Sequence, residues 1–264
     1  MVRIEAVTTC VNYSDFLAET ARHNRHLFER WIIVTRPEDE DTIKVCRTHN
    51  LECIVTTDFA RDGEAFNFNK GRAISLGISQ LSTDAWVCHI DADTVLPRDT
   101  LRYLSIAKIK PGNLYGIDRV RVTSWDDWKR VEARDVLHYQ HVHHLVVVPP
   151  EERLGHRIVR DGFGYVPIGY FQLWHSTDGM SGNWRYKDYP FTNSTAAHSD
   201  IKFALQWPRE NRVLIPELFC WHLESEASPN GHNWKGRQSK LFGPSGGNPV
   251  VKSSGMNRVY DKPA

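Results

Sequence analysis

The sequence has 264 residues, 41% apolar and 25% charged, as in an ordinary globular protein with room for one large α/β domain or two small ones. Its 33 basic and 32 acidic residues give a net charge of +1, which excludes a whole-molecule field that attracts nucleic acid or acidic membranes. No apolar run approaches the ~20 residues of a membrane span, and the opening residues lack the apolar region of a secretory signal. Because the five cysteines include no C-x-x-C pair, we expect reduced thiols in a cytoplasmic protein.

The first half of the chain alternates strand-like and helix-like stretches. We expect strands at 4–11, 31–35, 51–56 and 85–90, and helices at 15–28, 37–50 and 69–81. Ser14 is expected to cap the first helix, and Pro37 with the acids after it to open the second. Strands separated by helices of this length predict βαβ units and a parallel sheet.

The second half is less regular. We expect strands at 114–122 and 212–221 and a helix at 196–207. The last forty residues contain ten Gly or Pro, about twice the usual share, which predicts a loop-rich tail or lid. We therefore expect a single domain over 1–225, made of halves at 1–125 and 126–225, followed by a tail at 226–264.

A buried strand ending at Ile90 runs directly into two carboxylates, Asp91 and Asp93. In an extended chain, residues i and i+2 face the same side, so both can point at one cation or its water shell. Without a metal the two acids would repel a diphosphate, whereas a divalent cation would bind carboxylates and phosphates together. The alternative, a turn or cap before a helix near Pro97, requires only one acid. We therefore predict a metal site at the carboxyl end of this strand, where open α/β sheets bind ligands.

The segments around this pair resemble the GT-A glycosyltransferases. Phe68-Asn69-Lys70-Gly71-Arg72-Ala73, one helix before Asp91-Ala92-Asp93-Thr94-Val95-Leu96-Pro97, is similar to the galactosyltransferase group, and 11–17 looks like the nucleotide-binding start of family 2. The similarity is best over 3–125 and thinner over 160–225. It implies an α/β fold of the GT-A type, with a Rossmann-like, mostly parallel sheet. It also implies transfer of a hexosyl or pentosyl group from a UDP-sugar or other nucleoside-diphosphate sugar, with Mn²⁺ or Mg²⁺.

The resemblance implies roles for individual residues. Asp93 would be the main metal ligand and Asp91 the second, directly or through water. The nucleotide and its phosphates would be bound by Thr8, Thr9, Asn12, Asp58, Asn69, Lys70, Arg72 and Asp91. A plain turn aspartate is an even alternative for Asp58, and a solvated helix face is the commoner fate of residues such as Lys70 and Arg72.

Four candidates lie in the second half. Asp200 lies before the last strand at the distance where the resemblance places the acceptor-side acid, so it could be the base of an inverting transfer. The alternative is that an aspartate in the first turn of a helix simply complements the helix dipole. His222 follows that strand and suits manganese beside carboxylates, unless it packs among aromatic residues. Trp174 and Trp184 are candidate platforms for the acceptor, although most tryptophans belong to cores.

Two other functions stay open: a nucleotidyltransferase on a related fold, and a non-catalytic module that binds sugar or nucleic acid. The loop from Thr8 to Tyr13 contains no glycine, which counts against the first alternative. The near-neutral charge counts against a general nucleic-acid binder. The acceptor stays open as well, since a glycan, a lipid-linked molecule, a protein or a modified nucleic-acid base would each fit.

Overall fold

The structure is a computed structural model, and it describes residues 2–57, 59, 69–122, 125–133, 158–160, 164–179, 189–190 and 199–223. Asp58, Trp184 and the predicted tail at 226–264 lie outside the described residues, as does the predicted helix start at 196–198.

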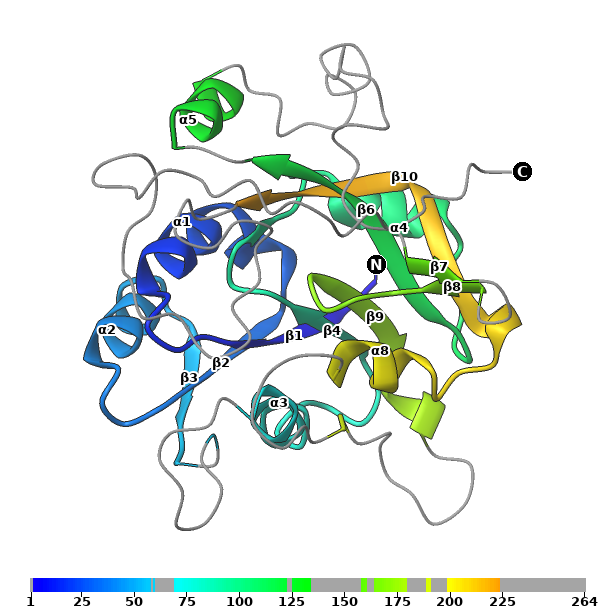
Figure 1. The fold of residues 1–264 in the computed structure, drawn as a ribbon, viewed down its shortest axis with the longest axis horizontal. Helices are drawn as coiled ribbons and strands as arrows, with labels where there is room; N and C mark the ends of the chain where they lie inside the picture. Colours follow the sequence, from blue (N-terminus) through cyan, green and yellow to red (C-terminus); the bar gives the residue numbers. More distant parts are fainter. Residues whose placement is uncertain are drawn as a thin grey trace.

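An eight-stranded mixed sheet forms the centre of the fold, in the order β3-β2-β1-β4-β9-β6-β10-β5 (Figure 1). Its strands are β1 (Ile4–Thr9), β2 (Arg30–Thr35), β3 (Glu52–Val55), β4 (Trp86–Ile90), β5 (Thr94–Val95), β6 (Leu114–Val122), β9 (Phe171–His175) and β10 (Arg212–Leu223). The pairs within β1–β4 and the pair β6–β10 are parallel, whereas β9 is antiparallel to β4 and β6, and β5 to β10. A separate ribbon pairs β7 (Ile158–Arg160) with β8 (Gly164–Val166). The predicted α/β fold with a Rossmann-like, mostly parallel sheet is confirmed.

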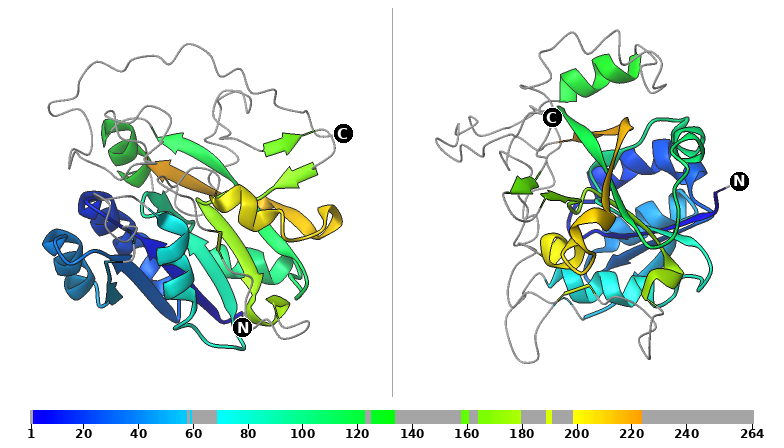
Figure 2. Two further views of the ribbon diagram at one scale, coloured as in Figure 1. Left: turned by 60° about the horizontal axis from the view of Figure 1, so that its bottom comes forward. Right: turned by 90° about the vertical axis from the view of Figure 1, so that its right-hand side faces the viewer.

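Helices cover both faces of this sheet. One face carries α1 (Ser14–Asn24), α2 (Glu40–Thr48), α4 (Thr100–Ile106) and α5 (Trp125–Ala133), and the other carries α3 (Lys70–Ile78) and α8 (Ser199–Ala204). Figures 1 and 2 show α3 and α8 on the opposite side of the strands from α1 and α2. Short 3-10 turns lie at Arg25–Leu27, Ser176–Gly179 and Arg209–Asn211.

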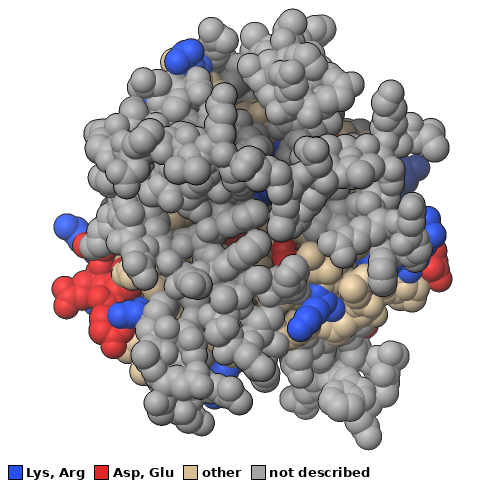
Figure 3. All heavy atoms as spheres, in the orientation of Figure 1, with Lys and Arg blue, Asp and Glu red and all other residues tan. Residues whose placement is uncertain are grey.

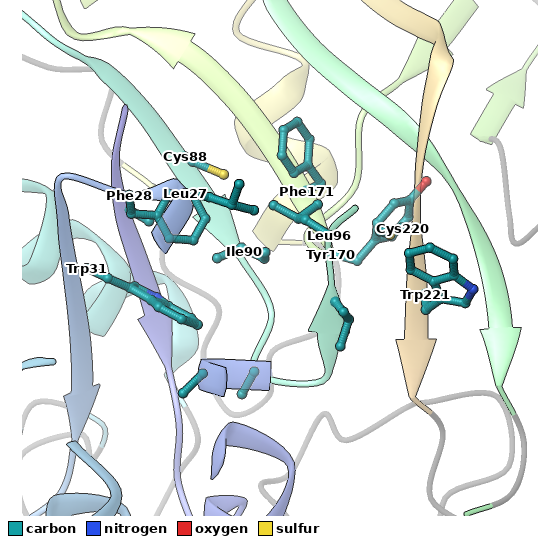
Figure 4. Packing of buried hydrophobic residues seen from close by; sticks show 14 of the residues in the cluster. Leu27, Phe28, Trp31, Cys88, Ile90, Leu96, Tyr170, Phe171, Cys220 and Trp221 are labelled. Atoms are coloured by element: carbon teal, nitrogen blue, oxygen red, sulfur yellow. The ribbon is translucent and has the colours of Figure 1, made fainter. Parts of the chain in front are cut away.

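The core consists of two apolar clusters separated by the sheet. Cys88 and Ile90 of β4 point into the cluster beneath α1, which is shown in Figure 4. Val87 belongs to the cluster beneath α3, and His89, two residues further on, continues that face and contacts the ring of Tyr189. This alternation is the pattern of a strand covered on both faces, and it decides which residues of β4 reach the site.

The first two helices do not begin at the predicted residues. Ser14 is the first residue of α1 rather than its cap, and Tyr13 before it makes no side-chain capping bond. The second helix begins at Glu40 rather than Pro37, because the Asp39 side chain accepts a hydrogen bond from an amide of the first turn and fixes the start there.

Five elements had no counterpart in the sequence-based expectations: β5, β7, β8, β9 and α5. The predicted strand at 114–122 matches β6, and β10 extends two residues beyond its predicted end. All five cysteines are free, as predicted. None of the helices in the described ranges combines the length and apolar character that a bilayer crossing requires. Acidic side chains gather over α2 at one edge of the face in Figure 3, where Glu40 and Asp41 are exposed.

Candidate functional site

Asp91 and Asp93 lie where the chain leaves the end of β4. From β1 the sheet extends through β2 and β3 on one side, whereas β4 lies on the other side of β1. Such a reversal of strand order is where open α/β sheets form their ligand crevices. The amide of Thr94 donates to the carbonyl of Asp91 at 3.2 Å, so both aspartates are part of a tight turn between β4 and β5.

Helix α1 fixes the backbone of this turn. Thr20 donates its hydroxyl to the carbonyl of Ala92 at 2.9 Å. One turn later, the Asn24 amide nitrogen donates to the carbonyl of Thr94 at 2.7 Å, and its oxygen accepts from the amide of Leu96 at 2.9 Å. Thr20 and Asn24 are both fully buried, so the turn is attached to a rigid element through satisfied buried polar groups.

Asp93 is opposed by His222. The pairing of β10 with β5 sets His222 opposite Thr94, and the amide of Leu223 donates to the carbonyl of Asp93 at 2.8 Å. Nε2 of His222 then lies 3.6 Å from Oδ1 of Asp93. The other carboxylate oxygen accepts from the hydroxyl of Tyr13 at 3.1 Å. Oδ1 is buried and accepts no hydrogen bond from any described residue.

The Asp93–His222 pair fits a divalent cation. Burial raises the pKa of Asp93, the charge of Asp91 raises it further, and His222 opposes the shift. A buried carboxylate oxygen without a donor is costly, and a cation would satisfy it. Two ligands of one cation, bound at about 2.1 Å each, are separated by roughly 3 to 4 Å. The observed 3.6 Å lies within that range.

Asp91 has a different partner. It forms an ion pair with Nζ of Lys70, the first residue of α3, and Nε2 of His89 lies 3.7 Å from the same oxygen, Oδ1. Burial alone would lower the pKa of Lys70, but the charge of Asp91, with smaller contributions from Asp200 and Asp93, raises it. Lys70 therefore stays an ammonium ion within the field of three carboxylates.

His89 is neutral at physiological pH, because burial and the nearby charge of Lys70 lower its pKa to about 3. Its Nδ1 lies 3.1 Å from the hydroxyl of Tyr189, which donates to Oε1 of Gln172 at 2.8 Å. The nitrogen of Gln172 donates to the carbonyl of Asp200 at 3.0 Å. A chain of polar side chains thus connects β4 to α8.

Asp200 lies beside this chain. Its carboxylate accepts from the amide of Gly169 at 2.9 Å and from its own following amide, that of Ile201, at 2.8 Å. A side chain at Gly169 would come within 3.4 Å of both Asp200 and Cε1 of His89, so the three residues are neighbours. The structure therefore brings Asp200 into the site of Lys70 and Asp91.

Three predicted contacts are corrected by the structure. Thr8 and Thr9 belong to β1 rather than to the loop after it, and both are buried. The hydroxyl of Thr8 donates to the carbonyl of Ile90 at 2.7 Å and accepts from Trp31, so it ties strands together. Trp174 is only 4% exposed in β9 and packs against the rings of Phe203 and Trp207, so it presents no open face to an acceptor.

The remaining predicted residues, Asn12, Asn69 and Arg72, are half-buried. Asn12 follows β1 with a positive φ of 52°, and its backbone N–H donates to the carboxylate of Asp39 at 2.7 Å. Asn69 caps α3 by accepting from the amide of Arg72 at 3.3 Å, and the Arg72 side chain is half-buried. Asn69 therefore orients the helix that carries Lys70.

Sequence reasoning missed Tyr13, His89, Gln172 and Tyr189. His89 had a usable signal, because it precedes Asp91 by two residues in a buried strand and must share its face. The other three reach the site through tertiary contacts between segments far apart in the chain. No periodicity in the sequence reports such contacts.

Comparison with known proteins gives matches among solved structures only: no protein-family model matches the sequence, and no curated protein matches it. The chain is similar to mannosyl-3-phosphoglycerate synthase from Rubrobacter xylanophilus, with 21% identity and a TM-score of 0.36 over 46% of this chain and 41% of that one. It is similar to glucosyl-3-phosphoglycerate synthase from Mycobacterium tuberculosis in complex with Mn²⁺ and UDP-glucose, with 13% identity and a TM-score of 0.49 over 85% and 72% of the two chains. For the same synthase in complex with UDP, the identity is 14% and the TM-score 0.33, over 44% of each chain. The first and third matches span less than half of the length of the matched protein.

Proposed function

We propose that this chain is a metal-dependent glycosyltransferase that moves a hexosyl or pentosyl group from a nucleoside-diphosphate sugar to an acceptor hydroxyl. The observation that carries the proposal is the buried, unpartnered Oδ1 of Asp93 with Nε2 of His222 at 3.6 Å. This pair lies at the switch point of the sheet, beside an ammonium group. A cation and a tethered ammonium at one strand end suit a diphosphate leaving group.

The described residues divide the work between them. Asp93 and His222 would hold Mn²⁺ or Mg²⁺, which when bound supplies positive charge for the departing diphosphate. Lys70 would contact the donor phosphates, and Asp91 keeps its ammonium in place until then. Since Thr20 and Asn24 fix the turn, the carboxylates need no rearrangement before the donor binds.

Asp200 is the proposed general base, and the transfer is proposed to invert the anomeric centre. An inverting transfer is a single displacement that needs one carboxylate to accept the acceptor's hydroxyl proton. Two backbone amides fix the Asp200 carboxylate, and each of its oxygens keeps a further lone pair. Proton NMR of the product's anomeric configuration tests the stereochemistry.

The alternatives make different demands on the same site. A nucleotidyltransferase would release pyrophosphate from a nucleoside triphosphate and a sugar phosphate, using the same cation. A non-catalytic module would bind sugar or nucleic acid without turnover. The buried carboxylate of Asp93 and the half-buried pair of Asp91 and Lys70 favour an anionic ligand that carries its own cation over a neutral sugar or a nucleic-acid strand.

The test is a panel of nucleoside-diphosphate sugars measured by thermal shift and by product formation, with Mn²⁺ and again in excess chelator. A donor at about 100 times its dissociation constant should stabilise the protein by about 2.7 kcal/mol, and chelator should remove most of that gain. Equal nucleoside-diphosphate affinity with and without metal would contradict the proposal. Pyrophosphate release from triphosphates without sugar transfer would favour the nucleotidyltransferase.

A further inference from the structure

Arg119 of β6 is a buried cation with no anionic partner among the described residues. It is 6% exposed, its Nε is buried and makes no hydrogen bond with a described residue, and its guanidinium pairs with no described carboxylate. Arginine stays charged in proteins, so it cannot lower the cost of burial by losing a proton. A buried guanidinium whose donors are not all used therefore needs an anion that the described residues do not supply.

The register of the sheet places Arg119 on the same face as His222. In the parallel ladder between β6 and β10, Arg119 is opposite Cys220, and residues in register point to the same side of a sheet. Side chains alternate along a strand, so His222, two residues after Cys220, points to that side as well. Arg119 and the proposed metal ligand are therefore diagonal neighbours on one face.

Tyr170 contacts both of them. Cζ of Arg119 is 4.8 Å from the centroid of the Tyr170 ring, and the same ring meets the imidazole of His222 at 6.4 Å in a T-shaped arrangement. The Tyr170 hydroxyl donates to the carbonyl of Ile117 in β6 at 2.5 Å, which fixes the ring against the strand that carries Arg119 (Figure 4). A cation over an aromatic face is held without using its N–H donors, so this contact leaves the donors for a ligand.

The chain before Tyr170 leads to the proposed base. The backbone N–H of Gly169 donates to the carboxylate of Asp200 at 2.9 Å, and Tyr170 is the next residue. Tyr170 thus connects Arg119 with the base through one neighbour and with the proposed metal position through its ring. In the proposed function the acceptor hydroxyl reacts between base and cation, and the donor phosphates already have the cation and Lys70 as partners. Arg119 is therefore a positive charge on the acceptor side.

We propose that Arg119, stacked on Tyr170, binds an anionic group of the acceptor, a phosphate or a carboxylate. A guanidinium can donate two parallel hydrogen bonds to two oxygens of either group, which fixes its orientation as well as its position. The acceptor would then carry its reacting hydroxyl near a phosphate or a carboxylate, which a neutral glycan does not. The anion site stands on the geometry of Arg119 alone, whereas its assignment to the acceptor rests on the proposed function.

The probe is inorganic phosphate, titrated by calorimetry into the full chain, first alone and then with Mg²⁺ and a nucleoside diphosphate saturating the donor site. With the donor site filled, the wild type should still bind one phosphate per chain. Arg119→Met should weaken that binding about tenfold or more, and Arg119→Lys should weaken it less, because lysine keeps the charge but not the planar pair of donors. The control is Arg3→Met, which removes an exposed arginine just before β1 and should leave the affinity unchanged.

Equal phosphate affinity in the wild type and Arg119→Met would overturn the inference. Phosphate binding that the nucleoside diphosphate abolishes would overturn it as well, because Arg119 would then belong to the donor. A second measurement does not depend on how Arg119→Met folds: in the wild type, phosphate should shift the Nε–H proton resonance of Arg119, assigned by its loss in Arg119→Lys. An unmoved resonance would refute the site. Nucleoside-diphosphate affinity that does not depend on Mg²⁺ would contradict the proposed function and leave the anion site intact.

Discussion

Helix α1 contributes to two groups of carboxylates and histidines, and the groups differ in how their charge is balanced. On one side, Thr20 and Asn24 bind the turn that carries the two aspartates. On the other, Glu19 and His23 meet Glu132 of α5, with ligand atoms within 4.8 Å of one another. Distance alone would therefore favour the Glu19–His23–Glu132 group, because among the described residues the aspartate group offers close ligand atoms only in pairs, at 3.6 Å and 3.7 Å.

Charge separates them. Glu19 and Glu132 share the guanidinium of Arg22, Glu132 also pairs with Lys129 at 2.9 Å, and Trp128 donates to Glu19 at 2.8 Å. Near the two aspartates, in contrast, the ammonium of Lys70 pairs with Asp91 alone, and Oδ1 of Asp93 has no donor among the described residues. The carboxylates of the first group are balanced by cationic side chains and join two helices, whereas the second group needs another cation.

The Asp93→Asn variant tests most directly whether the aspartate group binds a cation. Loss of a residue that hydrogen-bonds to a metal ligand typically lowers metal affinity by roughly 10–100-fold. Loss of the ligand itself should lower the affinity by at least that factor, and turnover should fall with it. Folding should be little affected, because the change removes an uncompensated buried charge. Calorimetry with Mn²⁺ and chemical denaturation, run on the same sample, measure both. Unchanged Mn²⁺ affinity would show that Asp93 is not a ligand.

Asp200→Asn should lower turnover by about 10²–10⁴-fold, the usual cost of losing a positioned base. Donor and Mn²⁺ affinity should stay within a few-fold, since asparagine can still accept from the amide of Gly169. Steady-state kinetics with calorimetry separate the two effects. Near-normal turnover in this variant would exclude Asp200 as the base and leave the metal assignment intact.

Asn24→Ala should weaken Mn²⁺ binding by about 10–100-fold, although Asn24 touches neither aspartate side chain. Its amide makes two of the bonds that fix the turn, to Thr94 and Leu96. Asn24→Asp is the matched variant, because it keeps the acceptor for Leu96 and loses the donor to Thr94. An intermediate affinity for Asn24→Asp would show that both bonds position the ligands, and equal affinities in all three proteins would show that neither does.

Metal affinity should depend on pH through Asp93. Its pKa is raised above the ordinary value of 3.8 in the metal-free protein, and a cation binds the ionised form. A cation also needs the second ligand, His222, in its unprotonated form, so affinity should be constant at high pH and fall by about tenfold per unit for each of the two ligands that takes up a proton as the pH drops. Mn²⁺ titrations between neutral pH and pH 4 measure the midpoint. Affinity that is still constant down to pH 4 would contradict the raised pKa of this carboxylate.

The sequence was sufficient for those parts of the molecule that follow from local pattern. Strand-like stretches that alternate with helix-like stretches predicted β1–β4, and the position of the acids after β4 indicated the edge of the sheet where a ligand binds. It failed where a partner comes from elsewhere in the chain. Trp174 was a candidate platform for the acceptor but packs against Phe203 of α8, and β9 inserts between β4 and β6 by antiparallel pairings that no local signal reports. His222 was predicted as a metal ligand, but the β5–β10 pairing that brings it to Asp93 was not.

The smallest expected effect concerns the Glu19–His23–Glu132 group between α1 and α5. Glu19→Gln keeps the shape and an acceptor for Trp128 but removes the charge that Arg22 pairs with, so we expect a loss of about 1–3 kcal/mol in unfolding free energy at pH 7. Burial would raise the pKa of Glu19, but bonds from His23 and Trp128 and the charge of Arg22 lower it to about 2, from an ordinary 4.5. The stabilisation is therefore present above pH 4.5 and is lost as the pH falls toward 2, so the difference between variant and wild type should shrink over that interval.

Urea denaturation at pH 7 and pH 3 measures this difference in unfolding free energy. The control is Glu29→Gln, which changes an exposed acid whose ion pair with Arg3 should contribute at most about 1 kcal/mol. Calorimetry should show that Glu19→Gln binds as many Co²⁺ ions per chain as the wild type. One ion fewer would mean that a metal displaces Arg22 from these carboxylates, and that charge balance does not distinguish the two groups.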